Sequence, residues 1–216
     1  WIAAAGGMAS IDSDIPIIIL FPEIAFHSAR FIKAVGQKVK QYGYCSIVVS
    51  EGVRADDGKF LSDQDSRDAF GHAQLGGAAP VIANLIKKGL DLKYHWAVAD
   101  YLQRSARHIA SKTDVEHAYS VGQAAVKMAL QGKNSVMASI CRTSNNPYRW
   151  KIVEAPLSKV ANREKMMPRG FISRDGFGIT ARCREYLAPL IKGEDYPPFQ
   201  NGLPQYTRLR NISLKK

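Results

Sequence analysis

The sequence has few of the features that mark membrane, secreted or metal-binding proteins. Its three cysteines, Cys45, Cys141 and Cys183, are widely spaced and form no CxxC pair, so we predict reduced thiols in a cytosolic protein. The longest apolar run, from Ile15 to Phe21, is far shorter than the roughly 18 residues of a membrane span. P-loop, GxGxxG, HExxH and GxSxG motifs are absent, and the five histidines have no metal-ligand spacing. We therefore expect a cytoplasmic protein that is not bound to a membrane.

Acidic residues are scarce relative to basic ones, which gives the chain a formal net charge of +11. Such a charge fits a solvated basic surface, or a partner among nucleic acids, anionic lipids and phosphorylated metabolites. The basic residues are spread along the chain, and only the tail with Arg208, Arg210, Lys215 and Lys216 is locally dense. Because no alternating aromatic and basic platform is present, we do not expect a nucleic-acid partner. Small anionic ligands remain the main alternative to a merely solvated surface.

The first third of the chain predicts a strand, a helix and a second strand. Ile15 to Phe21 is continuously apolar, as in a strand covered on both faces, and Cys45 to Ser50 is predicted to be a second buried strand. Between them, apolar residues recur at helical spacing from about Ser28 to Tyr42, with Ser28 as the predicted cap and Gly43 as the stop. This pattern predicts a βαβ unit with parallel strands.

The remainder predicts further alternating elements. We expect a helix around residues 81–88, a strand over Lys93–Ala99, and a helix that begins at Thr113 and ends at Gly132. Its predicted packing face consists of small residues, and its His117 is predicted to lie at the surface. That face comprises Val115, Ala118, Gly122, Ala125 and Ala129. Two short strands (135–140 and 150–153), a helix (179–191) and an irregular tail (193–216) complete a mixed α/β protein with at least four strands.

Two features rise above this background as binding candidates. Glu51 follows the second strand directly, where ligands bind in open α/β sheets, and its carboxylate could accept hydrogen bonds from sugar hydroxyls. Tyr101–Arg104 lies at the end of the predicted strand 93–99, and the arginine fork suits phosphate oxygens. A solvated Glu51 and a purely structural Arg104 are the alternatives. His72 is a third, weaker candidate, and a loop histidine near a glycine turn is the better explanation for it.

These residues also resemble a known family. Trp1–Gly7 is similar to the helix after the Met-Gly-Arg motif of 6-phosphofructokinases, and Ile17–Phe26 resembles the strand and Pro-Glu that follow. Ser50-Glu51-Gly52 resembles the substrate-binding glutamate, and Tyr101–Arg104 the His-or-Tyr-x-Gln-Arg segment. The segments that most resemble the diphosphate-dependent bacterial branch come later in the chain, at Met167–Phe171 and Tyr196–Pro198. In order and spacing, the resemblance covers nearly the whole chain.

The resemblance implies a phosphofructokinase-like three-layer sandwich with a mostly parallel sheet, as the C-terminal portion of a two-domain enzyme. Residues 1–192 would then be the sugar-phosphate-binding α/β portion, followed by the tail. The family's donor-binding half, including its catalytic aspartate and Mg²⁺ ligands, has no counterpart in this sequence. Because Trp1–Ala5 reads as a helix interior, we expect the biological chain to start upstream.

The resemblance further implies a glycolytic phosphotransferase that makes fructose 1,6-bisphosphate from fructose 6-phosphate, with diphosphate as donor and Mg²⁺ as cofactor. Glu51 would bind sugar hydroxyls, while Tyr101 and Arg104 would hold the 6-phosphate and Gln103 would have a less defined role. Lys93 or His95 would lie near a contact from a neighbouring subunit of a homodimer or homotetramer. An ATP-dependent kinase of the same family and a non-catalytic sugar-phosphate-binding protein remain the alternatives.

Overall fold

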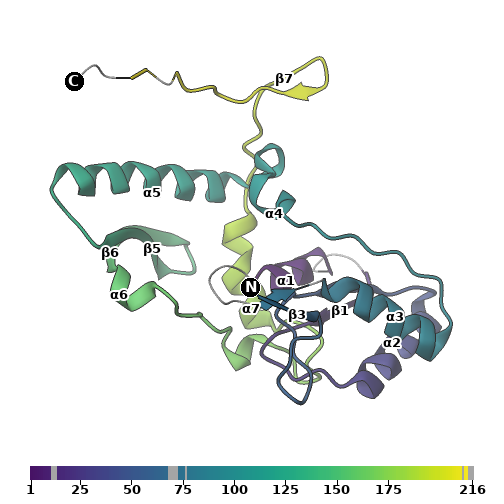
Figure 1. The fold of residues 1–216 in the computed structure, drawn as a ribbon. Helices are drawn as coiled ribbons and strands as arrows, with labels where there is room; N and C mark the ends of the chain where they lie inside the picture. Colours follow the sequence, from purple (N-terminus) through teal and green to yellow (C-terminus); the bar gives the residue numbers. More distant parts are fainter. Residues whose placement is uncertain (11–13, 68–72, 76, 211, 214–216) are drawn as a thin grey trace. The chain divides into compact units, whose positions relative to one another are not determined.

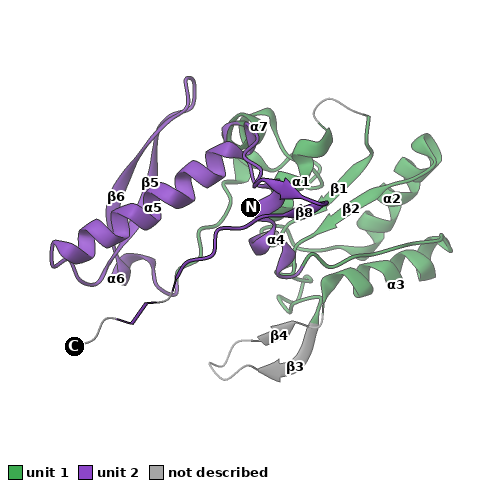
Figure 2. Ribbon diagram, turned by 90° about the horizontal axis from the view of Figure 1, so that it is seen from above, with its two compact units in different colours: residues 1–99, 163–188 green, residues 100–162, 189–216 purple. Residues whose placement is uncertain are grey.

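The computed structural model describes residues 1–10, 14–67, 73–75, 77–210 and 212–213, with the backbone alone for residues 63–67, 73–75 and Gln103 (Figure 1). The chain divides into two compact units (Figure 2). Unit 1 comprises residues 1–99 and 163–188, and unit 2 comprises residues 100–162 and 189–216. These are units of packing, so the predicted functional division at residue 192 stays a prediction.

Unit 1 is organised around the predicted βαβ unit, which is confirmed. Strand β1 (Ile17–Leu20) pairs in parallel with β2 (Ser46–Val49), with Ile18 opposite Ile47. The connecting helix α2 spans Ser28–Tyr42, as predicted, and Gly43 ends it in the left-handed conformation at φ 80°. The predicted cap is wrong by one residue, because His27 is the N-cap and Ser28 is already helical.

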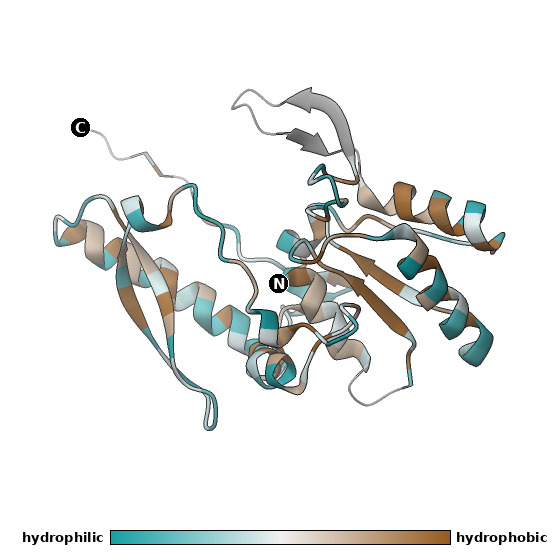
Figure 3. Cartoon of the chain, turned by 90° about the horizontal axis from the view of Figure 1, so that it is seen from below, coloured by the Kyte–Doolittle hydropathy of each residue, from teal (hydrophilic) through white to brown (hydrophobic). Residues whose placement is uncertain are grey.

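Helices cover both faces of this parallel pair, which makes three layers. On one face, Ile18 and Leu20 pack in a cluster with Phe31 and Val35 of α2 and with α3 (Ala78–Leu90). On the other face lie α1 (Ile2–Gly6), which was predicted as a helix, and the 3₁₀ turn η1 (Gly7–Ser10). A Cβ on Gly7 would lie 2.9 Å from the side chains of both Ile19 and Ile179, so the close approach there requires glycine. The strands form the hydrophobic, brown centre of unit 1 in Figure 3, and the predicted layered α/β architecture is confirmed.

Residues 163–188 return to unit 1 and complete its second face. This segment contains the 3₁₀ turn η3 (Arg169–Phe171) and helix α7 (Ala181–Leu187), which begins at the capping residue Thr180. The backbone N–H of Ile19 donates to the carbonyl of Phe177 at 2.8 Å, and the rings of Trp1 and Tyr186 pack at a tilt with centroids 5.5 Å apart. The helix predicted over residues 179–191 is therefore shorter, and it continues as the 3₁₀ turn η4 (Ala188–Ile191), which contains Pro189.

The strand predicted over Lys93–Ala99 is wrong. These residues are extended but pair with no strand among the described residues, and the side chains of Trp96 and Val98 are about half exposed. A partly alternating pattern is not sufficient, because a strand also needs a neighbour for its backbone hydrogen bonds. The loop predicted from Val53 to Asp68 instead contains β3 (Asp63–Arg67), which pairs antiparallel with β4 (Ala73–Leu75).

Unit 2 consists of one long helix on a hairpin, together with short turns. The two strands predicted in this region exist and are longer than expected, because β5 (Val136–Ser144) and β6 (Arg149–Pro156) form one antiparallel hairpin. Helix α5 (Lys112–Leu130) packs against it and begins at Ser111, whose hydroxyl accepts from the N–H of Asp114 at 3.1 Å. The other short elements are α4 (Leu102–Ser105), η2 (Arg107–Ile109), α6 (Leu157–Val160), β7 (Phe199–Gln200) and β8 (Leu203–Pro204). The last two form a small hairpin within the tail that was predicted to be irregular.

The predicted packing face of α5 is wrong. Ala118, Gly122 and Ala125 are exposed, whereas His117, which was predicted to be exposed, is 6% exposed. His117 contacts two aromatic residues of the hairpin: its ring lies edge-on at 4.6 Å from Trp150, and its Nε2 lies 3.1 Å from the hydroxyl of Tyr148. A hydrogen bond and ring packing make the burial of this polar side chain acceptable.

No helix in the described parts of the chain combines the length and the apolar character that a membrane crossing requires.

Candidate functional site

Glu51 lies where the sequence predicted, just beyond the carboxyl end of a parallel strand. Strand β2 ends at Val49, and the chain then turns, with the N–H of Val53 donating to the carbonyl of Ser50 at 3.2 Å. The turn is packed against the neighbouring loop, because a Cβ on Gly52 would lie 3.3 Å from Pro22. The Glu51 side chain is exposed. A carboxylate in this position is open to a ligand at the strand-end edge of unit 1.

Tyr101 and Arg104 lie close together in unit 2, but on a helical turn rather than after a strand. Tyr101 is the N-cap of α4, and Arg104 is in that single turn. The guanidinium carbon of Arg104 lies 6.0 Å from the centre of the Tyr101 ring, at the outer limit of a cation–π contact. Tyr101 is 71% exposed and Arg104 is also exposed. The pair thus presents a hydroxyl and a guanidinium to solvent from one turn.

The other sequence candidates are spread over both units. Gln103 is in α4 by its backbone, and its side chain lies outside the described atoms. His72 lies outside the described residues, while Lys93 and His95 are exposed in the extended segment before α4. Glu51 belongs to unit 1 and Arg104 to unit 2. A site that combines both residues is a proposal.

Arg107 is the residue in this region whose role the sequence did not reveal. Its guanidinium donates to the backbone carbonyl of Asp195 through Nη1 and to the Asp195 carboxylate through Nη2 at 3.0 Å. The basic character of Arg107 was visible in the sequence, but nothing local pointed to a partner 88 residues away.

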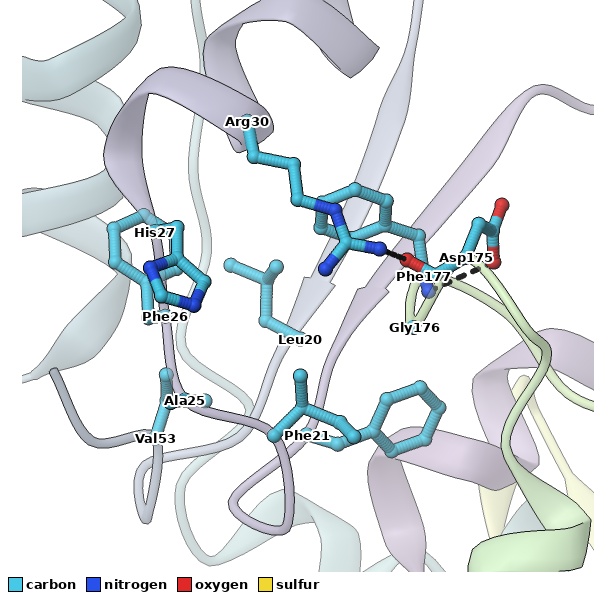
Figure 4. Close-up of a pocket in the computed structure, with 11 residues that line it drawn as sticks. Leu20, Phe21, Ala25, Phe26, His27, Arg30, Val53, Asp175, Gly176 and Phe177 are labelled. Carbon is cyan, nitrogen blue, oxygen red and sulfur yellow. Dashed lines mark hydrogen bonds between the residues drawn. The ribbon is translucent and has the colours of Figure 1, made fainter. Parts of the chain in front are cut away.

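A small pocket at the carboxyl end of β1 was not expected from the sequence (Figure 4). Its walls include Phe21 and Phe177, and its polar lining residues are His27, Arg30 and Asp175. The guanidinium of Arg30 lies 5.2 Å from the centre of the Phe177 ring and donates to the backbone carbonyl of Asp175. None of the predicted binding residues lines this pocket.

The electrostatics of this pocket point to a structural role. Burial alone would raise the pKa of Asp175, but hydrogen bonds from Ser173 and from the Phe177 N–H lower it, as do the charges of Arg30 and Lys38. The net pKa is below its ordinary value, so the carboxylate stays ionised within its own loop. Arg30 and Asp175 therefore join the loop of residues 173–177 to the start of α2.

Comparison with known proteins gives a consistent result, although no family model matches the chain. Over its full length the chain is 62% identical to pyrophosphate–fructose 6-phosphate 1-phosphotransferase of Methylococcus capsulatus and 60% identical to that of Halomonas elongata. It covers 52% of each. The crystal structure of a pyrophosphate-dependent phosphofructokinase from Nitrosospira multiformis superposes with a TM-score of 0.84 at 61% identity, and the chain covers 51% of it.

The similarity is continuous, because it includes every part of this chain and holds in both sequence and fold. The chain spans about half the length of the curated relatives and solved structures that it matches. The sequence comparison and the structural comparison both lead to pyrophosphate-dependent enzymes, at about 60% identity. Over its whole length, in sequence and in fold, the chain is similar to about half of a pyrophosphate-dependent phosphofructokinase.

Proposed function

We propose that this chain supplies the acceptor-side binding groups of a pyrophosphate–fructose 6-phosphate 1-phosphotransferase. The observation that carries the proposal is the exposed pair of Tyr101 and Arg104 on one helical turn, with ring and guanidinium 6.0 Å apart. A planar guanidinium can donate two parallel hydrogen bonds to a phosphate group, and the tyrosine hydroxyl adds a third donor. The names of the relatives support fructose 6-phosphate and diphosphate as substrates.

In this mechanism, the chain binds and orients the sugar. Arg104 and Tyr101 hold the 6-phosphate, and Glu51 accepts hydrogen bonds from sugar hydroxyls. The 1-hydroxyl oxygen of fructose 6-phosphate then attacks the terminal phosphorus of diphosphate, and the bridging P–O bond breaks. Fructose 1,6-bisphosphate and phosphate are the products. The hydroxyl proton goes to a base for which we assign no residue of this chain. Phosphoryl transfer depends largely on such positioning and on charge stabilisation.

Magnesium belongs to the proposal only as a cofactor bound elsewhere. Within the described ranges, no group of three or more His, Cys, Asp or Glu side chains could hold a metal ion. We propose that the ligands of the ion lie outside this chain, and no step is assigned to the ion. A glycolytic role in the cytoplasm and assembly as a homodimer or homotetramer are likewise proposals.

The test is calorimetric titration of fructose 6-phosphate into the complete natural polypeptide that carries this sequence. Arg104→Ala should weaken binding by about 1.5–3 kcal/mol, the range for hydrogen bonds to charged groups. Arg149→Ala is the matched control, because Arg149 is an exposed arginine of the same unit, and it should leave affinity unchanged. Equal affinities for the Arg104→Ala and Arg149→Ala variants would remove Arg104 from the site. A coupled assay with diphosphate and with ATP then decides the donor.

A further inference from the structure

The turn that carries Tyr101 and Arg104 has little support of its own. Helix α4 is one turn long, and its local bonds run to the Tyr101 carbonyl from Arg104 N at 2.9 Å and from Ser105 N at 3.1 Å. Tyr101 and Leu102 are 71% and 66% exposed, so neither anchors the turn in a core. An isolated turn of helix is unstable in water because nucleation fixes several residues for one hydrogen bond. Side chains on such a turn hold a ligand well only if neighbouring contacts fix the backbone.

The first long-range contact after α4 is the forked bond from Arg107 to Asp195. Both hydrogen bonds end on one residue, because Nη1 meets the Asp195 backbone carbonyl and Nη2 meets its carboxylate at 3.0 Å. Both side chains are 39% exposed, so the pair is only partly open to water. A planar fork that makes two bonds fixes direction as well as distance, which a lysine ammonium cannot do.

The bond from Arg107 is the first of a series along residues 190–195, which we call the strap. The Ser111 hydroxyl donates to the carbonyl of Leu190 at 2.6 Å, and the N–H of Lys112 donates to the carbonyl of Gly193 at 2.9 Å. Gly193 has φ 78°, and a Cβ there would lie 2.9 Å from the Cβ of Lys112. Both facts require glycine, so the strap fits closely against residues 107–113.

We propose that Arg107 and Asp195 are positioning residues that fix the turn carrying Tyr101 and Arg104 in its phosphate-binding conformation. This inference rests on the proposed function, because it gives the strap a task only if that turn binds the sugar phosphate. Arg107 is two residues beyond α4, and holding its guanidinium on the strap restricts the backbone through which Arg104 is placed. Neither Arg107 nor Asp195 needs to touch the substrate.

Three variants of the complete natural polypeptide test the proposal. Arg107→Lys keeps the charge and loses the fork, Asp195→Asn keeps the shape and loses the charge, and Gly193→Ala displaces the strap without changing any charge. Each should raise the KM for fructose 6-phosphate by about tenfold, the scale expected when a binding group is misplaced by a fraction of an ångström. The KM for diphosphate should stay constant. Asp195→Asn carries the test if Gly193→Ala does not fold.

The control is a second ion pair of unit 2 with similar exposure. Lys133 and Glu154 lie 3.3 Å apart and are 44% and 41% exposed. Glu154→Gln should leave both KM values unchanged. If Asp195→Asn behaves like Glu154→Gln, or if the KM values for both substrates rise together, the positioning role is wrong.

Combining substitutions separates this inference from the proposed function. If Arg107 acts through Arg104, then Arg107→Lys should add little to the KM of an Arg104→Ala variant, because the group that it positions is gone. Independent, multiplicative effects would overturn the positioning role while leaving Arg104 as a phosphate ligand. If instead Arg104→Ala alone changes no KM, the proposed function fails first.

Discussion

Unit 1 is held together by buried aliphatic and aromatic side chains, whereas unit 2 is held mainly by hydrogen bonds, ion pairs and one buried histidine. Among the described residues, every buried aliphatic or aromatic hydrocarbon side chain except the Pro197 ring belongs to unit 1, and in unit 2 only His117 and Pro197 are buried. A helix on a two-stranded hairpin has too little apolar surface to enclose a core. Partly exposed polar contacts contribute about 1 kcal/mol or less each. Unit 2 should therefore open locally more readily than unit 1.

The largest difference between the units should appear when a large side chain is truncated in each. Phe31 is fully buried beneath β1, and Phe31→Ala should lower the free energy of unfolding by about 3–5 kcal/mol, from lost burial and the cavity left behind. Leu130 at the end of α5 is 84% exposed, and Leu130→Ala should cost no more than about 0.5 kcal/mol. Native-state hydrogen exchange of the α2 and α5 amides measures both. Comparable losses would mean that the apolar side chains of α5 are as important as the core of unit 1.

A smaller effect should distinguish unit 2 through pH. Burial lowers the pKa of His117, the charges of Asp114 and Glu116 partly offset this, and Arg142 lowers it further. The pKa is thus lower in the folded than in the unfolded state, where it is near 6.5. The unfolded state binds the proton more readily, so stability is full above about pH 6.5 and falls as pH drops towards the folded pKa.

Trp150 fluorescence should follow this transition, because its ring lies 4.6 Å from His117. Urea unfolding monitored at that signal between pH 7.5 and pH 5 should show the loss, and His117→Gln should flatten it. A steep dependence that survives in His117→Gln would assign the effect to another group of the hairpin.

The smallest effect should be a difference in thiol reactivity. Cys183 in α7 of unit 1 is fully buried, and burial raises its pKa. Burial also raises the pKa of Cys45, which the charge of Lys38 partly offsets. Cys141 lies half-buried on the β5–β6 hairpin. Because the exposed thiolate is the reactive form, a thiol reagent followed by peptide mass spectrometry should modify Cys141 first and Cys183 last. Early modification of Cys183 would show that α7 opens as easily as the hairpin.

The sequence was most informative where local signals agreed. The apolar runs at residues 15–21 and 45–50, the helical period between them and Gly43 predicted β1, α2 and β2 nearly to the residue. The sequence did not predict the buried face of α5, because the small residues that indicated a packing face are exposed. The buried position belongs to His117, whose partners Tyr148 and Trp150 lie 31 and 33 residues further along the chain.

The candidate site divides in the same way. Glu51 could be placed from the strand that precedes it, and Tyr101–Arg104 from its resemblance to a family segment. The strand predicted before Tyr101 has no pairing partner among the described residues. The amino-acid pattern of one segment does not show whether a neighbouring strand is present, so this error could not be avoided from the sequence. The contact between Arg107 and Asp195 depends on how the chain returns after 88 residues, which no local pattern encodes.

The discontinuity of unit 1 has a practical consequence for anyone who wishes to isolate it. Its two segments, residues 1–99 and 163–188, are separated in the gene by most of unit 2. A product truncated after residue 99 would lose the buried side chains of Ile172, Ile179 and Leu187. No single cut can therefore release unit 1. Its expression requires either a bridge that joins residue 99 to residue 163 or two peptides that associate after synthesis.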